Sequence, residues 1–168
     1  GVDTALYASA DENSEKLVTI AADSRLSIWQ IQDGWAVVPY KRVVGYLYVG
    51  DIKQLEPVAP NPDYAQEGDI ISVFTTFYTL RNTELNQGRM ENIRVGCAYI
   101  NGQYDAGYVF DFDAVAGPYR KSRGYKDSPV LINGESVAGS GGGTCQVSTT
   151  LYNALLQIPE GISIIYRH

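Results

Sequence analysis

The chain has 168 residues, of which 45% are hydrophobic and 19% charged, and its net charge at pH 7 is −6. This composition is typical of one or two folded globular domains. The negative charge argues against nucleic acid and anionic membrane surfaces as partners, because both select basic proteins. No apolar run approaches the roughly 18 residues that span a bilayer. The first residue is Gly1 and not Met, and the sequence does not open with the charged stretch and apolar stretch of a signal peptide. We therefore expect a chain from which any signal peptide or membrane anchor has been removed.

Short strands separated by turns are predicted over residues 1–57. The strands are expected at residues 6–7, 16–20, 26–31, 35–40 and 45–49. The Asp33-Gly34 pair is a strong signal for a tight hairpin between two of them. Close and even spacing without a helical pattern predicts a small closed β-barrel.

This first segment resembles a bacterial SH3-like domain, of the kind appended to cell-wall proteins. The matching features are the pairs Leu6-Tyr7, Gly34-Trp35 and Gly45-Tyr46. The resemblance implies binding of peptidoglycan stem peptides or bridges, with Trp35 and Tyr46 as ligand-binding residues. The alternative is that Trp35 belongs to the core and the barrel is only a spacer, since a fold alone does not fix a function.

Residues 58–69 are predicted to be a linker, because their prolines keep the backbone extended and stiff. The overall fold class is therefore α+β, with the barrel followed by a mixed α+β domain over residues 70–168. In that domain we expect strands and helices in alternation. The strands are predicted at 70–78, 109–112, 130–132 and 162–166, and the helices at 90–100 and from Thr144 to about residue 160.

The two cysteines lie on the two predicted helices. Cys97 shares a helical stripe with Ile93 and Ile100, so we expect it to be a buried small hydrophobe rather than half of a disulfide. Cys145 lies off the apolar stripe that begins at Val147.

A glycine-rich run precedes the second helix and gives the chain its most distinctive stretch. It reads Gly139-Ser140-Gly141-Gly142-Gly143-Thr144-Cys145-Gln146. Glycine allows positive φ and close backbone approach, and Thr144 is predicted to be the N-cap whose hydroxyl accepts from first-turn amides. Cys145 then lies at the positive end of the helix dipole, where the thiolate is favoured and the thiol pKa is lowered.

The run GGGTCQVSTTLYNALL resembles the signature of the VanW family, envelope proteins named after glycopeptide-resistance gene clusters. Further matching features lie at Phe74-Thr75-Thr76, Arg89, Asn92-Ile93, Phe110 to Asp113, Gly117-Pro118, Gly124-Tyr125 and Arg167-His168. The resemblance covers roughly residues 70–168. Family members usually continue beyond the Arg-His pair, so we expect this VanW-like domain to be C-terminally incomplete. The resemblance implies an extracellular or cell-envelope location and little about chemistry, because the family's activity is not settled.

Cys145 at a helix start, followed by a strand that carries His168, matches the order in papain-like and transglutaminase-like enzymes. Cys145 is then the nucleophile and His168 the base, while Gln146 and the first-turn N–H groups form an oxyanion site. This interpretation predicts cysteine-based acyl transfer or hydrolysis on wall peptides. The alternative is that Cys145 is a small residue that pins the glycine turn.

A carboxylate, such as the end of a stem peptide, also fits the start of this helix. The residues predicted to hold it are Gly141, Gly142, Gly143, Thr144, Ser148, Arg120 and Arg123. The run lacks the Lys-Ser/Thr ending of a phosphate loop, so no nucleotide is expected. Asp111 and Asp113 are read as capping residues in preference to an acid–base pair. One histidine and two scattered cysteines give no metal-ligand spacing, and no cofactor is expected.

The sequence therefore predicts a cell-envelope protein that binds or remodels peptidoglycan peptides. Peptidoglycan or its stem peptides are the expected partners, and the membrane is expected to be contacted only through a removed N-terminal anchor. The alternative function is a non-catalytic wall-binding or structural module linked to glycopeptide resistance.

Overall fold

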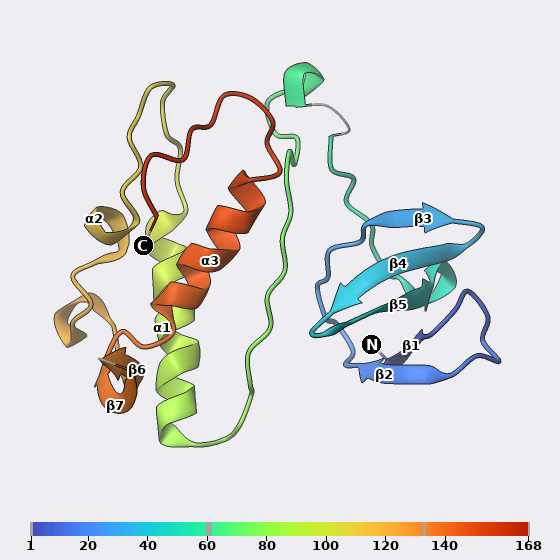
Figure 1. Ribbon diagram of the computed structural model, residues 1–168, viewed down its shortest axis with the longest axis horizontal. Helices are drawn as coiled ribbons and strands as arrows, with labels where there is room; N and C mark the ends of the chain where they lie inside the picture. Colours follow the sequence, from blue (N-terminus) through green and yellow to red (C-terminus); the bar gives the residue numbers. More distant parts are fainter. Residues whose placement is uncertain (1, 60–61, 133, 168) are drawn as a thin grey trace. The chain divides into compact units, whose positions relative to one another are not determined.

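The computed structural model describes residues 2–59, 62–132 and 134–167. The chain divides into two compact units, one of residues 1–77 together with 154–168, and the other of residues 78–153. A five-stranded sheet dominates the first unit, and helices with one hairpin make up the second (Figure 1). The mixed α+β class predicted from the sequence is confirmed.

The sheet of the first unit is antiparallel, with strand order β2-β1-β5-β4-β3. Its strands are β1 (Thr4–Tyr7), β2 (Lys16–Ile20), β3 (Gln30–Gln32), β4 (Trp35–Tyr40) and β5 (Val43–Tyr48). The short helical turns η1 (Val49–Asp51) and η2 (Pro62–Tyr64) follow it. Asp33 and Gly34 form the predicted hairpin turn, with φ of 52° and 81°.

The closed barrel is not formed, which corrects the prediction of an SH3-like barrel. Among the described residues β2 and β3 remain the two edges of an open sheet. The strand predicted over residues 26–31 is reduced to β3, and the Ser27 N–H donates to the Thr75 hydroxyl at 3.0 Å instead of to a neighbouring strand. A strand this short leaves nothing to pair with the far edge.

Alternating residues of the sheet build the core of the first unit. The buried members are Leu6, Ile20, Ala36, Val38, Tyr40 and Leu47. Gly45 is needed where β5 crosses β1, because a Cβ there would lie 2.7 Å from Leu6 Cγ. Phe77 packs against this core, with its ring centroid 4.7 Å from that of Tyr40.

Residues 70–78 do not form the predicted strand. Their only bridge in the described chain is a parallel one between Val58 and Ile70. The Gln157 side chain bonds both the N–H and the carbonyl of Val73, at 3.3 and 2.7 Å, and so takes the place of a neighbouring strand. A segment rich in β-branched residues still needs a partner to become a strand.

The longest helix of the second unit is α1 (Glu84–Ile100). It starts earlier than predicted because Thr83 caps it, its side-chain oxygen accepting from the Asn86 N–H at 3.3 Å. It ends at Asn101 as predicted. Cys97 is exposed, not buried, which corrects its prediction. The buried face of α1 consists of Gly88, Asn92, Val95 and Gly96, where small side chains let neighbouring segments approach.

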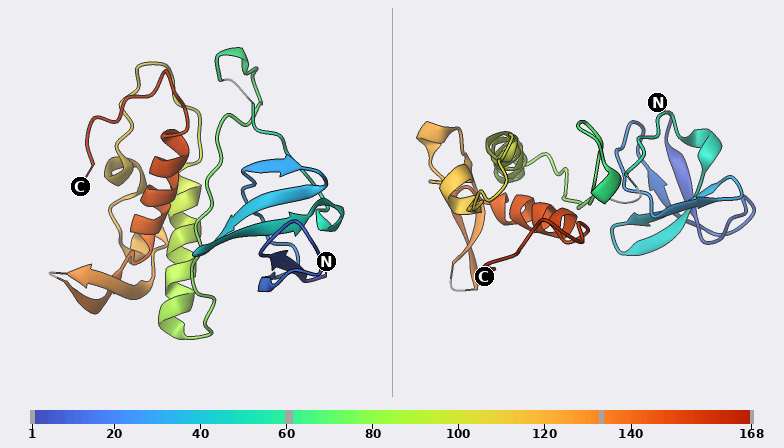
Figure 2. Two further views of the ribbon diagram at one scale, coloured as in Figure 1. Left: turned by 45° about the vertical axis from the view of Figure 1, so that its right-hand side comes forward. Right: turned by 90° about the horizontal axis from the view of Figure 1, so that it is seen from above.

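The rest of the second unit is α2 (Phe112–Ala116), η3 (Lys121–Arg123), the hairpin β6 (Asp127–Ile132) and β7 (Glu135–Ser140), and α3 (Thr144–Leu155). α1 contacts both β6 and α2 (Figure 2). The predicted strand at 109–112 is replaced by α2, because Asp111 caps a helix there. Residues 162–167 form no strand, against the prediction for 162–166. Asn133, in the predicted hairpin turn, lies outside the described residues. No helix in the described ranges is long and apolar enough to cross a membrane.

Candidate functional site around the start of α3

The helix α3 starts at Thr144, as predicted, but Thr144 is not its N-cap. Its hydroxyl donates to the carbonyl of Gly141 at 2.9 Å instead of accepting from first-turn amides, and its own N–H also bonds that carbonyl, at 3.2 Å. Thr144 is only 6% exposed. Its side chain therefore closes the turn before the helix rather than facing a ligand.

The glycines before α3 are packed against the protein's own groups. Gly141 and Gly143 have φ of 88° and 107°, which favours glycine strongly. A Cβ on Gly141 would lie 2.5 Å from Tyr119 Cβ, and one on Gly142 would lie 2.2 Å from a carbonyl oxygen of β6. A Cβ on Gly143 would lie 3.0 Å from Arg89 Cγ. Glycine is required at these three positions because neighbouring segments lie so close to the alpha carbons that a side chain would collide with them. The space beside the alpha carbons is therefore filled by the protein itself.

A buried asparagine holds this turn in place. Asn92 is 0% exposed, and its Nδ2 donates to the carbonyls of Lys126 and Gly142, both at 3.0 Å, and to the Ser128 hydroxyl at 2.9 Å. Its Oδ1 accepts from the Lys126 N–H at 2.7 Å. The Ser128 hydroxyl in turn donates to the Gly142 carbonyl at 3.0 Å. Asn92 thus ties α1, β6 and the glycine turn together.

The Cys145 side chain is a free, exposed thiol in the first turn of α3. Val147 is buried, so the predicted division between an apolar stripe and an open face of this helix is confirmed at these two positions. Gln146 is engaged within the protein: its N–H donates to the Gly143 carbonyl at 3.0 Å, and its Oε1 accepts from Arg89 at 2.9 Å. Among residues 144–147, Cys145 is the exposed residue and Gln146 is half-buried.

Tyr119 and Asp113 lie beside the glycine turn and were not predicted as a pair. The Tyr119 hydroxyl donates to Asp113 Oδ1. Burial raises the pKa of Tyr119, and the hydrogen bond to Asp113 raises it further. The charge of Cys145 also contributes to this upward pKa shift, which places the thiol within electrostatic reach of the phenol. A signal for this contact in the sequence is the glycine at position 141, which admits a bulky neighbour.

The remaining predicted site residues are scattered. Asp111 caps α2, as predicted, with its Oδ1 accepting from the N–H groups of residues 113 and 114 at 2.9 and 3.1 Å. Arg120 is exposed, whereas the Arg123 guanidinium stacks over the Tyr99 ring at 4.0 Å from its centroid. Ser148 is half-buried on α3. His168 lies outside the described residues, so the predicted pairing of Cys145 with His168 stays a prediction.

The aromatic residues predicted to bind ligand belong to the sheet of the first unit. Trp35 packs edge-on against Tyr7, with 5.7 Å between ring centroids, and tilts against Tyr48 at 5.6 Å. Tyr46 pairs in register with Tyr7 on the neighbouring strand. Because side chains alternate along a strand, these aromatics lie on the face opposite Ala36 and Leu47 of the core.

In the described parts of the chain, no three or more His, Cys, Asp or Glu side chains gather where they could hold a metal ion. Near the start of α3 the chain offers the Cys145 thiol and, beside the glycine turn, the Tyr119 phenol with its bond to Asp113. This set suits nucleophilic or proton-transfer chemistry.

Residues 88–168 match the protein family described as VanW like protein, so this part of the chain is a VanW-family domain. The match confirms the resemblance over this range and includes α1, the glycine turn and α3.

The protein named "Uncharacterized protein YoaR", from Bacillus subtilis (strain 168), is 37% identical to this chain over 84 residues. The aligned part covers 49% of this chain and 27% of that relative, so the chain spans little more than a quarter of the relative's length. No solved structure shows significant similarity to the chain. The resemblance of residues 1–57 to SH3-like domains is not confirmed.

Proposed function

We propose that this chain is part of an extracellular cell-envelope protein that remodels peptidoglycan peptides, with Cys145 as the nucleophile. The observation that carries the proposal is the exposed thiol in the first turn of α3. The positive end of the α3 dipole favours the thiolate over the neutral thiol. The VanW-family match supports an envelope setting, since the family takes its name from glycopeptide-resistance gene clusters.

The reaction has two steps. The Cys145 thiolate attacks the carbonyl carbon of a peptide bond, a thioester forms, and the released amine takes up a proton. Water then cleaves the thioester in hydrolysis, or a second amine cleaves it in acyl transfer, and the thiol is restored. His168 is the expected base for the first proton transfer.

Thiol reactivity is the direct test of this proposal. Iodoacetamide is added at about pH 6, where an ordinary cysteine with a pKa of about 8.5 is almost entirely protonated. We expect rapid labelling of Cys145 in a Cys97→Ser variant and slow labelling of Cys97 in a Cys145→Ser variant. Incubation with purified wall sacculi should then release or exchange peptides only when Cys145 is present. Labelling of Cys145 no faster than that of a free cysteine peptide would sink the enzyme proposal.

A non-catalytic wall-binding role is the second candidate, and the aromatic face of the sheet favours it. Half-buried tyrosine and tryptophan rings provide rigid amphipathic contact area at little entropic cost. The test is retention on purified sacculi of Trp35→Ala and Tyr46→Ala variants. Trp29→Ala is the matched control, because Trp29 is 66% exposed and lies just before β3. Retention that survives both substitutions on the aromatic face would rule out this face as the anchor.

A further inference from the structure

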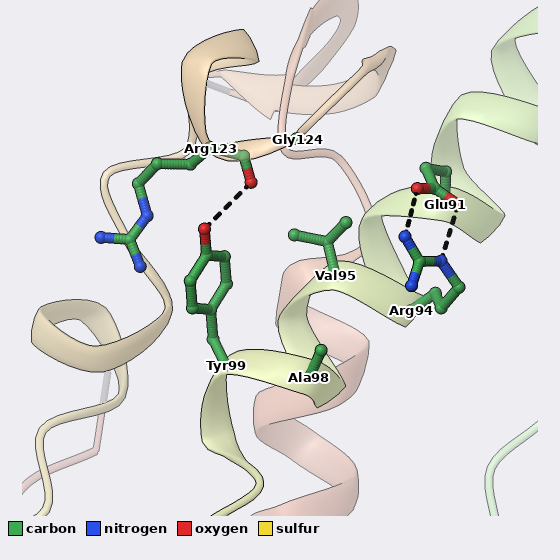
Figure 3. A pocket seen from close by; sticks show the side chains of 7 residues that line it. All are labelled: Glu91, Arg94, Val95, Ala98, Tyr99, Arg123 and Gly124. Atoms are coloured by element: carbon green, nitrogen blue, oxygen red, sulfur yellow. Dashed lines mark hydrogen bonds and ion pairs between the residues drawn. The ribbon is translucent and has the colours of Figure 1, made fainter.

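A surface pocket of about 290 Å³ lies between α1 and the turn that follows η3. Its lining residues are Glu91, Arg94, Val95, Ala98, Tyr99, Arg123 and Gly124. Figure 3 shows Val95 and Tyr99 pointing from α1 toward the Arg123–Gly124 turn, while Glu91 and Arg94 lie nearer the N-terminal end of the helix. All of these residues belong to the second unit.

Three of the lining residues on α1, namely Val95, Ala98 and Tyr99, form an apolar patch. Val95 is 7% exposed, Ala98 contributes only a methyl group, and the Tyr99 hydroxyl is taken up by a 3.1 Å bond to the Arg123 carbonyl. Gly124 forms the opposite wall of the pocket. A Cβ at this position would contact a methyl of Val95 at 3.6 Å and occupy part of the pocket. Pockets for small ligands commonly have such apolar walls with a few polar groups, at volumes of roughly 300 Å³ and above.

The charges around the pocket are unbalanced. Arg94 Nε and Nη2 bond the Glu91 carboxylate at 2.9 and 2.7 Å, and the positive charge of Lys126 also helps to lower the pKa of Glu91. The Arg123 guanidinium rests on the Tyr99 ring, and in the described chain no carboxylate pairs with it. Its Nε is buried without a hydrogen-bond partner. The pocket lining therefore carries two guanidinium groups, those of Arg94 and Arg123, and one carboxylate, in a protein whose net charge is −6.

We propose that this pocket binds a carboxylate carried on a small apolar group, namely the C-terminal end of a short peptide. The apolar group rests on Val95, Ala98 and the Tyr99 ring. The carboxylate accepts from Arg94, whose bonds to Glu91 use only two of its three nitrogens. This site goes beyond the proposed function, because it contains neither Cys145 nor the aromatic face of the first unit.

The test is an NMR titration of the ¹⁵N-labelled full chain with N-acetyl-alanyl-alanine. The same peptide with a C-terminal amide is the matched probe, because it differs only in charge. We expect saturable shifts at the backbone amides of Ala98, Tyr99 and Gly124 with the acid. A charge-assisted hydrogen bond contributes about 1.5 kcal/mol or more, so the amide should bind at least about tenfold more weakly.

Ala98 provides the variants, because it is exposed and tolerates longer side chains without loss of the fold. Ala98→Glu and Ala98→Gln fill the pocket mouth equally and differ only in charge. Ala98→Glu should bind the acid at least about tenfold more weakly than Ala98→Gln does. Cys145→Ser should bind it like the unaltered chain, which separates this site from the proposed reaction. Equal binding of acid and amide, equal binding by the two Ala98 variants, or shifts confined to other residues would each overturn the proposal.

Discussion

Replacing Asn92 by alanine is the sharpest test of how the second unit holds the turn before α3. The side chain is fully buried: the two hydrogens of its Nδ2 are shared among three acceptors and its Oδ1 accepts one bond, which amounts to three hydrogen bonds. Each buried hydrogen bond contributes about 1 kcal/mol, and an orphaned backbone group or the space left behind costs a further ~1–2 kcal/mol. The Gly142 carbonyl keeps its bond from Ser128, so it is not orphaned. We therefore expect Asn92→Ala to lower the free energy of unfolding by about 4 kcal/mol.

Urea unfolding followed by far-ultraviolet circular dichroism measures this loss, because the α-helices lie almost entirely in the second unit. Trp29 and Trp35, the only tryptophans, belong to the first unit, and their fluorescence reports on the sheet separately. Gln87→Ala is the matched control on the same helix: Gln87 is exposed, and its loss should change stability by no more than about 0.5 kcal/mol.

Asn92→Asp separates hydrogen bonding from shape. Aspartate has the same size as asparagine and keeps the oxygen that accepts from Lys126. In place of the donor Nδ2 it has a second oxygen, which would lie against the carbonyl oxygens of Lys126 and Gly142. At pH 7 this variant should be at least as unstable as Asn92→Ala, because a buried charge would lie against the carbonyl oxygens of Lys126 and Gly142, with the Ser128 hydroxyl as the one donor near the new oxygen. A loss below about 1 kcal/mol for Asn92→Ala would refute the reasoning, since it would mean that water replaces these contacts at little cost.

Three further predictions follow from the same unit. Gly142→Ala should lower the free energy of unfolding of the second unit by about 3 kcal/mol or more in the same assay, since the new Cβ would lie 2.2 Å from a carbonyl oxygen. Gly107→Ala is the control: its φ is 82° but the space around it is open, so it should lower this free energy by only about 1 kcal/mol. Tyr119→Phe removes the bond to Asp113 and should cost about 1 kcal/mol near neutral pH. Because the folded-state pKa of Tyr119 is raised, this contribution is complete below about pH 10 and lost as pH rises further, so the two stability curves should converge in alkali. Partial desolvation on α1 raises the pKa of Cys97, although the residue is exposed. In a variant without the other thiol, its alkylation at about pH 8 should therefore lag behind that of a cysteine peptide, and equal rates would contradict the raised pKa.

Predictions from the sequence were correct for turns, helix ends and one strand whose structure is determined by interactions between residues close together in the chain. The bounds of β2, the turn at Asp33-Gly34 and the end of α1 at Asn101 all agree with the structure. Each depends on interactions within a few residues, such as a left-handed turn or a helix end. Positions 70–78 and 162–166 were mispredicted as strands, because a strand forms only where another segment is in place to pair with it.

In the candidate site too, features determined by nearby residues were predicted correctly, and features that depend on distant residues were not. The start of α3 at Thr144 and the exposure of Cys145 followed from the glycine run and the apolar stripe. The direction of the Thr144 hydroxyl bond did not, because it depends on where the Gly141 carbonyl points. Asn92 gave no local signal either: a polar residue in a helix usually faces water, and its burial depends on partners 34 to 50 residues away.

Those long separations along the chain bear on how the protein is made. The amide of Asn92 is satisfied only once the chain has been synthesised as far as Gly142, because its partners lie on β6 and in the turn after β7. Contacts between distant residues form slowly, since a long loop must close first. On the ribosome, α1 must therefore wait for some 50 further residues before its inner face finds its partners. A ribosome stalled before the glycine run would thus leave a nascent helix open to proteases and chaperones.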